Sequence, residues 1–578
     1  MTMPGNFSQS LRRTGLAVGA LLLLTAGFGG LPVTQAIPQQ DAAPSGNPEG
    51  GIPVDHEATV LSCVRCHAMD DEGRMSRISY ERKTPEGWQT TIRRMVGLNG
   101  VELDPETARD ILRYLSDNHG LAPEEARPGF FEAERRVIVH DYEDDDTEVV
   151  CVQCHSMGRV ITQRRTAEEW GLLVAMHRGY YPFVDFQGTP AWRRRGRPDP
   201  EAADSRHPVD KALAHLVATY PFETDEWTAW STNRRDPRLA GRWAVEGRSV
   251  GGGPLYGTVE VAAVDGAAGE FTTEITLINA RSGAVSRRSG VANVYTGFQW
   301  RGRSTGQGAA DDTLREVMFV ERDWRQMSGR WFTGAYDEIG IDVTLHRGDV
   351  PVISGVYPVA LRNGTEMQEL TIYGANLPTG VAPADIDFGP RVMVTEIIDA
   401  ADEAIRVLVS VATDAVVGRR DLFVGSLARA EALAVYDSVD AVRVTPEHGM
   451  ARIGGVVVPK QFAQFEAIGV SNGADGEAGT EDDFDLGIVD VTWGLEEYSA
   501  TFDDDDIEFI GSLDANGMFT PAIDGPNPER SGNRNNIGDV WVVATYEEEG
   551  REKPLRGRAL LLVTVPLYMN FQALDVGR

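Results

Sequence analysis

The amino-acid sequence predicts a multidomain chain in which a helical first third is followed by an antiparallel β-barrel and two immunoglobulin-like β-sandwich domains. Helix caps and helical periodicity dominate up to about residue 230. From about residue 235, short alternating runs lie between turns rich in Gly, Asn and Asp. The chain has 578 residues, which is too long for a single hydrophobic core. We therefore expect a helical domain at 37–230, a barrel at 235–350, and sandwich domains at 351–437 and 438–578.

A leader segment precedes the helical domain. Residues 1–36 combine the basic pair Arg12 and Arg13 with an apolar run from Leu16 to Phe28, and they end in small residues. This pattern is typical of a cleaved secretory signal. The apolar run is short for a membrane span, and a retained anchor is the alternative interpretation. No later segment has about 18 uninterrupted apolar residues. We expect a periplasmic protein with no membrane span after signal removal.

Two Cys-x-x-Cys-His motifs lie in the helical domain, at Cys63–His67 and Cys151–His155. Together they contain all four cysteines of the chain, which are Cys63, Cys66, Cys151 and Cys154. This pattern attaches c-type haem through two thiols and places the adjacent histidine to coordinate the iron. A redox dithiol, a zinc site or structural disulfides would explain the cysteines but not the two repeated histidines. We expect two covalently bound haem c groups, with His67 and His155 as iron ligands.

The helical domain is an internal duplication, with units at about 55–125 and 140–230. Thr84 and Thr166 each precede a predicted helix, and Trp88 and Trp170 follow them at the same offset. Thr166 together with Glu169 predicts a capping box. A second helix closes each unit and begins at Asp104-Pro105 in the first unit and at Pro208 in the second.

The duplication also predicts the second axial ligands. Aligning Thr84 with Thr166 places Met95 opposite His177, and both residue types are good haem ligands. We expect Met95 to complete the first haem with His67, and His177 to complete the second with His155. The alternatives are Met69 and Met75 for the first haem and Met176, His207 and His215 for the second.

Unequal ligation has a redox consequence. Met ligation raises the potential of a haem relative to bis-His ligation, so we expect the second haem to have the lower potential. Electrons would then enter at the bis-His haem and leave from the Met-ligated one. The remaining histidines, His119 among them, are expected to be structural or solvated.

The surface is strongly acidic. The net charge is −32, and removal of Arg12 and Arg13 with the signal changes it to −34. This charge argues against nucleic acid as a partner and suits a partner with a basic face, although it also serves solubility. Acidic residues gather at Asp475–Asp485 and Asp503–Asp506. Oxygen-rich loops can hold calcium, but EF-hand spacing is missing here and such runs are usually solvated turns.

Repeated and alternating segments organise the β region. Leu239–Trp243 recurs as Met327–Trp331, so a glycine lies two residues before a tryptophan in both. Glycine near a large aromatic suits a strand that bends where the tryptophan closes a barrel end, and core filling is the favoured role of both tryptophans. Short strands such as Leu370–Leu377 and Asp421–Val424 resemble those of immunoglobulin-like modules, and Ala559–Val565 forms a final apolar strand.

A secreted two-haem unit followed by a barrel and two immunoglobulin-like units resembles the α subunit of quinohemoprotein amine dehydrogenase. The specific part of the resemblance is the two haem motifs with the segments Trp88–Met95 and Trp170–His177. It implies a periplasmic heterotrimer with a propeller-type β subunit and a small γ subunit. The γ subunit would carry a cysteine tryptophylquinone that oxidises primary amines. This chain would pass the electrons through its two haems to a soluble copper protein or cytochrome c.

The cysteine count agrees with that division of labour. A cysteine tryptophylquinone needs a cysteine, and the haem motifs use all four. We therefore expect no catalytic residue in this chain and an amine-oxidising site on another chain. The alternatives are a stand-alone diheme enzyme such as a peroxidase, which needs an open sixth position on one haem, and a secreted adhesion protein.

Overall fold

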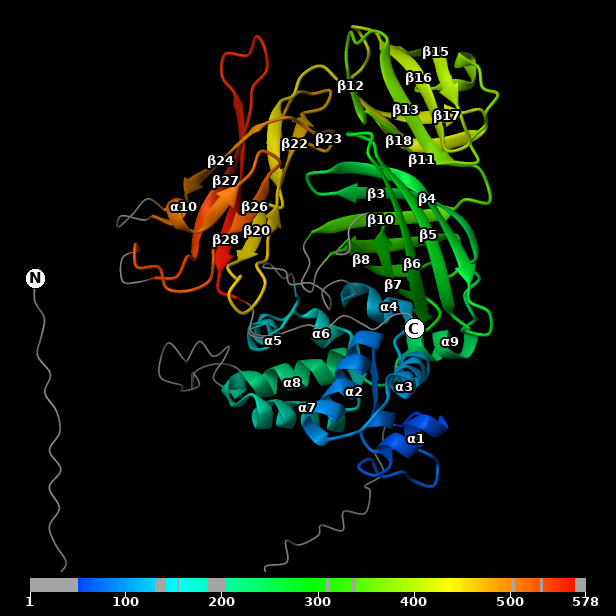
Figure 1. Cartoon of the computed structure of the whole chain (residues 1–578), viewed down its shortest axis with the longest axis vertical. Helices are drawn as coiled ribbons and strands as arrows, with labels where there is room; N and C mark the ends of the chain where they lie inside the picture. The colour runs from blue at the N-terminus through cyan, green and yellow to red at the C-terminus, as the bar shows by residue number, and fades with distance from the viewer. Residues whose placement is uncertain are drawn as a thin grey trace, which may run out of the picture. The chain divides into compact units, whose positions relative to one another are not determined.

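The computed structural model describes residues 50–129, 142–152, 155–185, 204, 206–307, 312–333, 339–499, 505–530 and 534–566. The predicted signal at 1–36 lies outside these ranges, as does Cys154. Helices dominate the first part of the chain and strands the rest (Figure 1). This order confirms the predicted change from helical to β structure. Within the described ranges, no helix is long and apolar enough to cross a membrane.

The helical region consists of two units, one around each Cys-x-x-Cys-His motif (Figure 1). The first unit comprises α1 (Glu57–Cys63), η1 (Ile78–Tyr80), β1 (Glu81–Lys83), α2 (Pro85–Asn99), α3 (Pro105–Asn118), α4 (Pro123–Ala126) and η2 (Arg127–Gly129). The second comprises α5 (Asp145–Cys151), α6 (Gly158–Ile161), β2 (Gln163–Arg165), α7 (Ala167–Tyr180), η3 (Pro182–Asp185) and α8 (Pro208–Thr219), and α9 (Asp225–Asn233) follows. In both units a motif helix leads to a short strand and then to two longer helices.

The helices that follow the short strands have matching N-termini. The side-chain oxygen of Thr84 accepts from the Gly87 amide at 3.4 Å, and that of Thr166 accepts from the Glu169 amide at 3.3 Å. Both threonines are therefore N-caps, as predicted. The predicted capping box is only half formed, because the Glu169 carboxylate does not return to the Thr166 amide. It pairs instead with Arg77 of the other unit at 2.6 Å.

The two aligned tryptophans hold their units together in the same way. Trp88 and Trp170 are at most 1 % exposed. The Nε1 of Trp88 donates to the His119 carbonyl oxygen at 2.8 Å, and the Nε1 of Trp170 donates to the Tyr220 carbonyl oxygen at 3.0 Å. His119 and Tyr220 are the C-caps of α3 and α8. Each indole thus ties the α2 or α7 helix to the end of the closing helix.

The strands β1 and β2 join the two units as an antiparallel pair. Their sequences, Glu81–Lys83 and Gln163–Arg165, are charged or polar throughout, yet five of the six residues are buried. Arg82 lies opposite Arg164 in this pair, and the carboxylate of Glu125 binds both guanidinium groups, at 2.7 Å and 3.2 Å. The contact between the units is therefore built from buried ion pairs.

The β region begins with a closed barrel of eight antiparallel strands in the order β10-β3-β4-β5-β6-β7-β8-β9, which confirms the predicted barrel. Its strands are β3 (Gly241–Ser249), β4 (Gly253–Ala263), β5 (Glu270–Asn279), β6 (Val285–Tyr295), β7 (Gln299–Gly306), β8 (Thr313–Val320), β9 (Gln326–Phe332) and β10 (Gly340–Arg347). The two repeated tryptophans, Trp243 and Trp331, lie in the barrel core. Their glycines are needed: Gly241 has φ +123°, and a Cβ on Gly329 would lie 2.1 Å from the Val317 carbonyl oxygen.

The helical region and the barrel share a core. Trp227 and Trp230 of α9 pack among the apolar residues of the barrel, and the Nε1 of Trp230 donates to the Thr296 carbonyl oxygen at 2.9 Å. Arg301 of β7 forms an ion pair with Glu86 in the first turn of α2. The helix that carries Met95 is thereby anchored to the barrel wall.

Two four-stranded sheets follow, in the orders β11-β13-β16-β15 and β12-β18-β17-β14, and they enclose one apolar core. The elements are β11 (Val352–Tyr357), β12 (Ala360–Arg362), β13 (Gln368–Ala375), η5 (Pro383–Asp385), β14 (Ile386–Asp387), β15 (Val392–Ala400), β16 (Ala404–Val411), β17 (Gly418–Val424) and β18 (Leu427–Tyr436). The immunoglobulin-like assignment of this region stays a prediction.

The last region has three sheets, in the orders β19-β22-β23, β20-β28-β27-β24 and β21-β26-β25. Its elements are β19 (Ala441–Thr445), β20 (His448–Arg452), β21 (Ala463–Gln464), β22 (Glu466–Ser471), β23 (Phe484–Ile488), β24 (Thr492–Glu497), α10 (Asp506–Phe509), β25 (Gly511–Leu513), β26 (Met518–Pro521), β27 (Gly538–Tyr546) and β28 (Leu555–Thr564). The apolar strand predicted at Ala559–Val565 lies within and just beyond β28. Its immunoglobulin-like assignment also stays a prediction.

Candidate functional site

The first motif lies at the C-terminal end of α1. The amides of Cys66 and His67 donate to the Cys63 carbonyl oxygen at 3.1 Å and 2.9 Å, which folds the motif into one tight turn. Cys63 is half-buried, Cys66 is exposed, and both thiols are free. Burial, with a smaller contribution from Cys66, raises the pKa of the Cys63 thiol to about 11. The turn brings two thiols and an imidazole together on one side of the unit.

The imidazole of His67 is oriented by the backbone. Its Nδ1 donates to the Ser76 carbonyl oxygen at 2.8 Å. This hydrogen bond fixes the tautomer of the ring and leaves Nε2 to bind a metal. A metal-binding histidine usually donates its other ring N–H to a carbonyl oxygen in this way.

The second motif begins at Cys151, the last residue of α5, a helix whose N-terminus is capped by the Asp144 side chain accepting from the Thr147 amide. Cys151 is a free, half-buried thiol, and burial raises its pKa to about 12. Cys154, the second predicted thiol, lies outside the described residues. The Nδ1 of His155 donates to the Ser156 carbonyl oxygen at 3.0 Å, a backbone contact like that of His67.

His177 of α7 lies next to His155. The ring centroids are 6.5 Å apart with an interplanar angle of 62°. A metal–imidazole nitrogen bond is about 2 Å long, so two rings at this separation would be close enough to bind one metal ion together. The Nδ1 of His177 donates to the Leu173 carbonyl oxygen at 2.8 Å, which leaves its Nε2 free. Burial lowers the pKa of His177 and so favours the neutral imidazole that binds metals.

The alternative histidines of the second unit are engaged elsewhere. The Nε2 of His215 is 2.8 Å from the Tyr142 hydroxyl, and its Nδ1 is 3.7 Å from a carboxylate oxygen of Asp144. His207 caps α8, with its Nδ1 accepting from the Val209 amide at 3.3 Å. These contacts favour His177 over both as the partner of His155.

Met95 lies on the third turn of α2, at the position on that helix which His177 holds on α7. It is partly exposed, and its sulfur accepts from the Asn99 side-chain amide at 3.6 Å. The alternative Met75 is completely buried in the apolar core around Trp88. Met69 packs against that core and forms an isolated β-bridge with Met75. Met75 is thus a packing residue, and Met95 remains the residue singled out by the internal alignment.

Sequence reasoning missed two features beside the motifs. One is the Arg82–Glu125–Arg164 cluster. Its members are far apart in the chain, so no local sequence pattern predicts it. The other is His119, which is 0 % exposed and has no hydrogen-bond partner at either ring nitrogen within the described ranges. Burial lowers the pKa of His119 to about 4. The residue is structural, as expected, but it is a neutral imidazole inside the core rather than a solvated one.

Among the residues that the structure describes, no group of three His, Cys, Asp or Glu side chains could hold a metal ion. In the acidic loop, the Asp482 carboxylate accepts from the Ala474 amide and from the Thr480 hydroxyl. This carboxylate is therefore used to fold its own loop.

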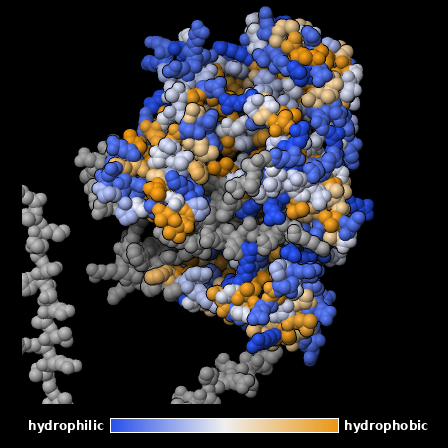
Figure 2. Space-filling model, in the orientation of Figure 1, coloured by the Kyte–Doolittle hydropathy of each residue, from blue (hydrophilic) through white to orange (hydrophobic). Residues whose placement is uncertain are grey.

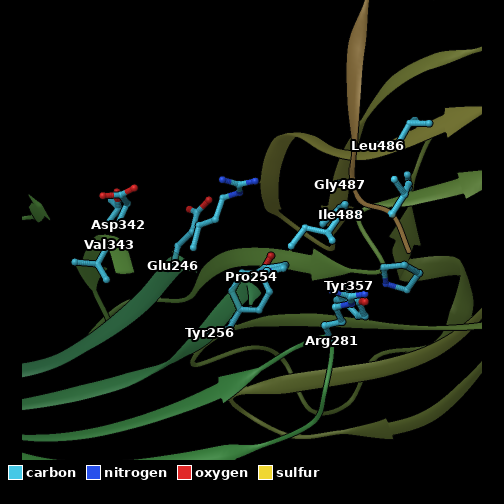
Figure 3. A pocket seen from close by; sticks show the side chains of 18 of the residues that line it. Glu246, Pro254, Tyr256, Arg281, Asp342, Val343, Tyr357, Leu486, Gly487 and Ile488 are labelled. Atoms are coloured by element: carbon cyan, nitrogen blue, oxygen red, sulfur yellow. The ribbon is translucent and has the colours of Figure 1, made fainter. Parts of the chain in front are cut away.

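A cavity of about 810 Å³ lies among the barrel and the two following regions, lined by Tyr256, Tyr357 and Ile488 among others (Figure 3). Its charged lining groups are paired: Glu246 with Arg429, Arg248 with Glu466, and Arg281 with Asp490. The surface of the face in Figure 2 mixes hydrophilic residues with apolar patches. Exposed apolar side chains also flank the predicted ligands, with Leu61 beside the first motif and Leu98 beside Met95.

Comparison with known proteins places this donor set in a family. Four family models of the quinohemoprotein amine dehydrogenase alpha subunit match the chain: haem binding at residues 56–227, domain II at 236–348, domain III at 351–437 and domain IV at 442–573. The comparison with curated proteins gives no match.

Similar solved structures cover parts of the chain. A de novo designed fluorescence-activating β-barrel is 17 % identical, covers 19 % of this chain and 92 % of its own, and has a TM-score of 0.16. Human protocadherin-24 EC1-2 is 11 % identical, covers 38 % of this chain and 99 % of its own, and has a TM-score of 0.15. The four family models together span most of the chain, and their haem-binding part contains both motifs. The chain therefore belongs to the quinohemoprotein amine dehydrogenase alpha subunit family, whose N-terminal domain binds haem.

Proposed function

We propose that this chain carries two covalently attached haem c groups and serves as the electron-transfer subunit of a periplasmic amine dehydrogenase. Cys63 and Cys66 would hold the first haem, and Cys151 and Cys154 the second. When bound, a haem supplies a one-electron carrier whose potential depends on its axial ligands. The chain would take electrons from a cysteine tryptophylquinone on a small γ subunit and pass them to a soluble copper protein or cytochrome c. A propeller-type β subunit would complete the heterotrimer.

The observation that carries this proposal is the close approach of the His155 and His177 imidazoles. His155 follows α5 and His177 lies on α7, and their ring centroids are 6.5 Å apart. Each ring donates its Nδ1 hydrogen to a backbone carbonyl oxygen, so Nε2 is the nitrogen that would bind a metal. We assign His155 and His177 to one iron, and by the internal alignment His67 and Met95 to the other.

The backbone carbonyls position these ligands. Ser76 and Leu173 hold the rings of His67 and His177 through hydrogen bonds of 2.8 Å each. A donor bond of this kind raises the basicity of the other nitrogen and prevents ring rotation. The buried pair Trp88 and Trp170 fixes the helices that carry Met95 and His177.

Covalent attachment is tested by intact mass spectrometry of the full chain expressed with haem-maturation machinery. We expect a mass increase of two haems after signal removal, and of one haem in each of the double variants C63A/C66A and C151A/C154A. A wild-type chain with no covalent haem, or with one, would refute the two-haem proposal.

The role in amine oxidation is tested on the native complex. We expect two partner chains to co-purify, one of them staining for a quinone, and the haem Soret band to shift on addition of a primary amine. An isolated chain that turns over peroxide would support the stand-alone peroxidase instead. That enzyme needs an open sixth position on one haem, and the proximity of His177 to His155 argues against an open position on the second.

A further inference from the structure

Two buried cations lie on the paired strands that precede the helices carrying the proposed distal ligands. Lys83 of β1 and Arg165 of β2 are 4 % and 3 % exposed. The Nζ of Lys83 donates to the Glu81 carboxylate and to the Thr91 hydroxyl, both at 2.8 Å. Arg165 forms an ion pair with the same carboxylate. The Glu81 carboxylate therefore already pairs with two cations, Lys83 and Arg165.

Arg94 adds a third cation to this group. It directly precedes Met95 on α2, and its charge acts on Lys83, on Arg165 and on His177 of the other unit. The Nε of Arg94 is buried and has no hydrogen-bond partner in the part of the chain that the structure describes. Its guanidinium also forms no ion pair with any described carboxylate.

The other nearby carboxylate is already engaged. Glu169 accepts from Arg77 at 2.6 Å and lies 3.7 Å from Arg165. The cluster therefore holds more cations than anions, with Arg77, Lys83, Arg94 and Arg165 against Glu81 and Glu169. Burial lowers the pKa of Lys83 to about 7, which relieves part of this excess at Lys83.

The Nε–H of Arg94 is a buried donor on a charged group, and such a donor is unfavourable unless an acceptor, best an anion, meets it. The prosthetic group of this family carries such anions, because a haem has two propionate carboxylates. Arginine binds a carboxylate through two parallel N–H donors, and this geometry gives a stronger contact than a lysine makes. The place of Arg94, beside Met95 in sequence and within electrostatic reach of His177, suits a propionate of a haem held by these ligands.

We propose that Arg94 binds a haem propionate carboxylate at the junction of the two units and thereby raises the potential of that haem. The inference rests on the proposed function in that a haem must lie at the ligands assigned above. A cation paired with the propionate stabilises the reduced haem, which has one positive charge fewer than the oxidised form. Arg94 is a positioning residue and transfers no electron itself.

The test compares R94Q, R94K and R178Q in the full, haem-loaded chain. Arg178 is the matched control, because it too is an arginine adjacent in sequence to a proposed ligand, His177. Its guanidinium, however, is paired at the surface with Asp185 at 2.8 Å and Asp210 at 3.3 Å. Midpoint potentials of both haems are measured by spectroelectrochemical titration. Covalent haem content is measured by intact mass on the same samples.

We expect R94Q to lower the midpoint potential of one haem and to leave the other near its wild-type value. R94K keeps the charge and should recover most of the shift, and R178Q should leave both potentials unchanged. A shift in the Met-ligated haem assigns the propionate to the first haem, and a shift in the bis-His haem assigns it to the second. Unchanged potentials in R94Q, or an equal shift in R94K, would overturn the proposal. Missing covalent haem in the wild-type chain would instead refute the proposed function.

Discussion

Replacing Glu125 by Gln tests how the two units of the helical region are held together. Glu125 lies on α4 and is 5 % exposed. It contacts Arg82 at 2.7 Å and 2.9 Å and Arg164 at 3.2 Å. Burial alone would raise the pKa of Glu125, but the hydrogen bonds and charge of Arg82, helped by Arg164, outweigh burial and leave the pKa lowered. The carboxylate is therefore ionised at neutral pH and neutralises two buried guanidinium groups.

The expected loss of folding free energy in E125Q depends on the hydrogen-bond acceptors that the guanidinium groups keep. Removing one partner of a buried ion pair costs about 3–5 kcal/mol of folding free energy, because the other charge stays buried. In E125Q, Arg82 retains the Phe222 carbonyl oxygen at 2.9 Å and 2.7 Å and the Gly120 carbonyl oxygen at 3.2 Å. These neutral acceptors reduce the penalty, so we expect the lower end of that range, about 3 kcal/mol.

The assay is urea unfolding of the haem-loaded chain, followed by Soret absorbance, which reports the helical region. Glu124 provides the control, because it is the adjacent residue on α4 and is exposed, and E124Q should change stability by less than about 0.5 kcal/mol. An apolar triple variant, R82M/E125L/R164M, removes all three charges together and should recover most of the loss. If E125Q lost less than about 1 kcal/mol, the ion-pair cluster would not be what joins the units.

Three further predictions concern the ligands and their supports. Because the pKa of His119 falls to about 4 on folding, the unfolded chain binds more protons between pH 6.5 and 4, and His119 should cost about 2 kcal/mol of stability on going from pH 7 to pH 5. Unfolding curves of H119L should lack this part of the pH dependence, and an unchanged slope would contradict the assignment. W170F and W88F remove the indole donors of the Tyr220 and His119 carbonyl oxygens, which keep the Arg165 and Lys83 amides as donors, so each variant should lose about 0.5–1.5 kcal/mol by thermal unfolding. H177M should raise the midpoint potential of the second haem, and an unaltered potential would show that His177 is not its ligand.

Local sequence signals were sufficient for the parts of the molecule that depend on local geometry. The spacing within Cys63–His67 and Cys151–His155 identified the motifs, and the offsets from Thr84 and Thr166 to the tryptophans identified the duplication. These features could be predicted because caps and motif turns involve residues close in sequence. The alternation of apolar residues identified the β region for the same reason.

Long-range ion pairs account for what was missed. The strands β1 and β2 have no apolar alternation, because they form between two units and are stabilised by charges such as Arg82, which meets Glu125 43 residues away. Glu169 was expected to close a capping box, but its carboxylate pairs with Arg77, 92 residues earlier in the chain. Neither partnership leaves a periodic signal, so only the folded chain reveals them.

The central claim is that the two haems have different axial ligands, methionine with histidine on one and two histidines on the other. Near-infrared magnetic circular dichroism of the fully oxidised chain tests it most directly, because sulfur–imidazole and bis-imidazole haems have different charge-transfer bands. We predict one haem of each type, with the bis-imidazole signal lost in H177A and the sulfur signal lost in M95A. Two bis-imidazole signals, or a sulfur signal that survives in M95A, would contradict the assignment of Met95 and His177.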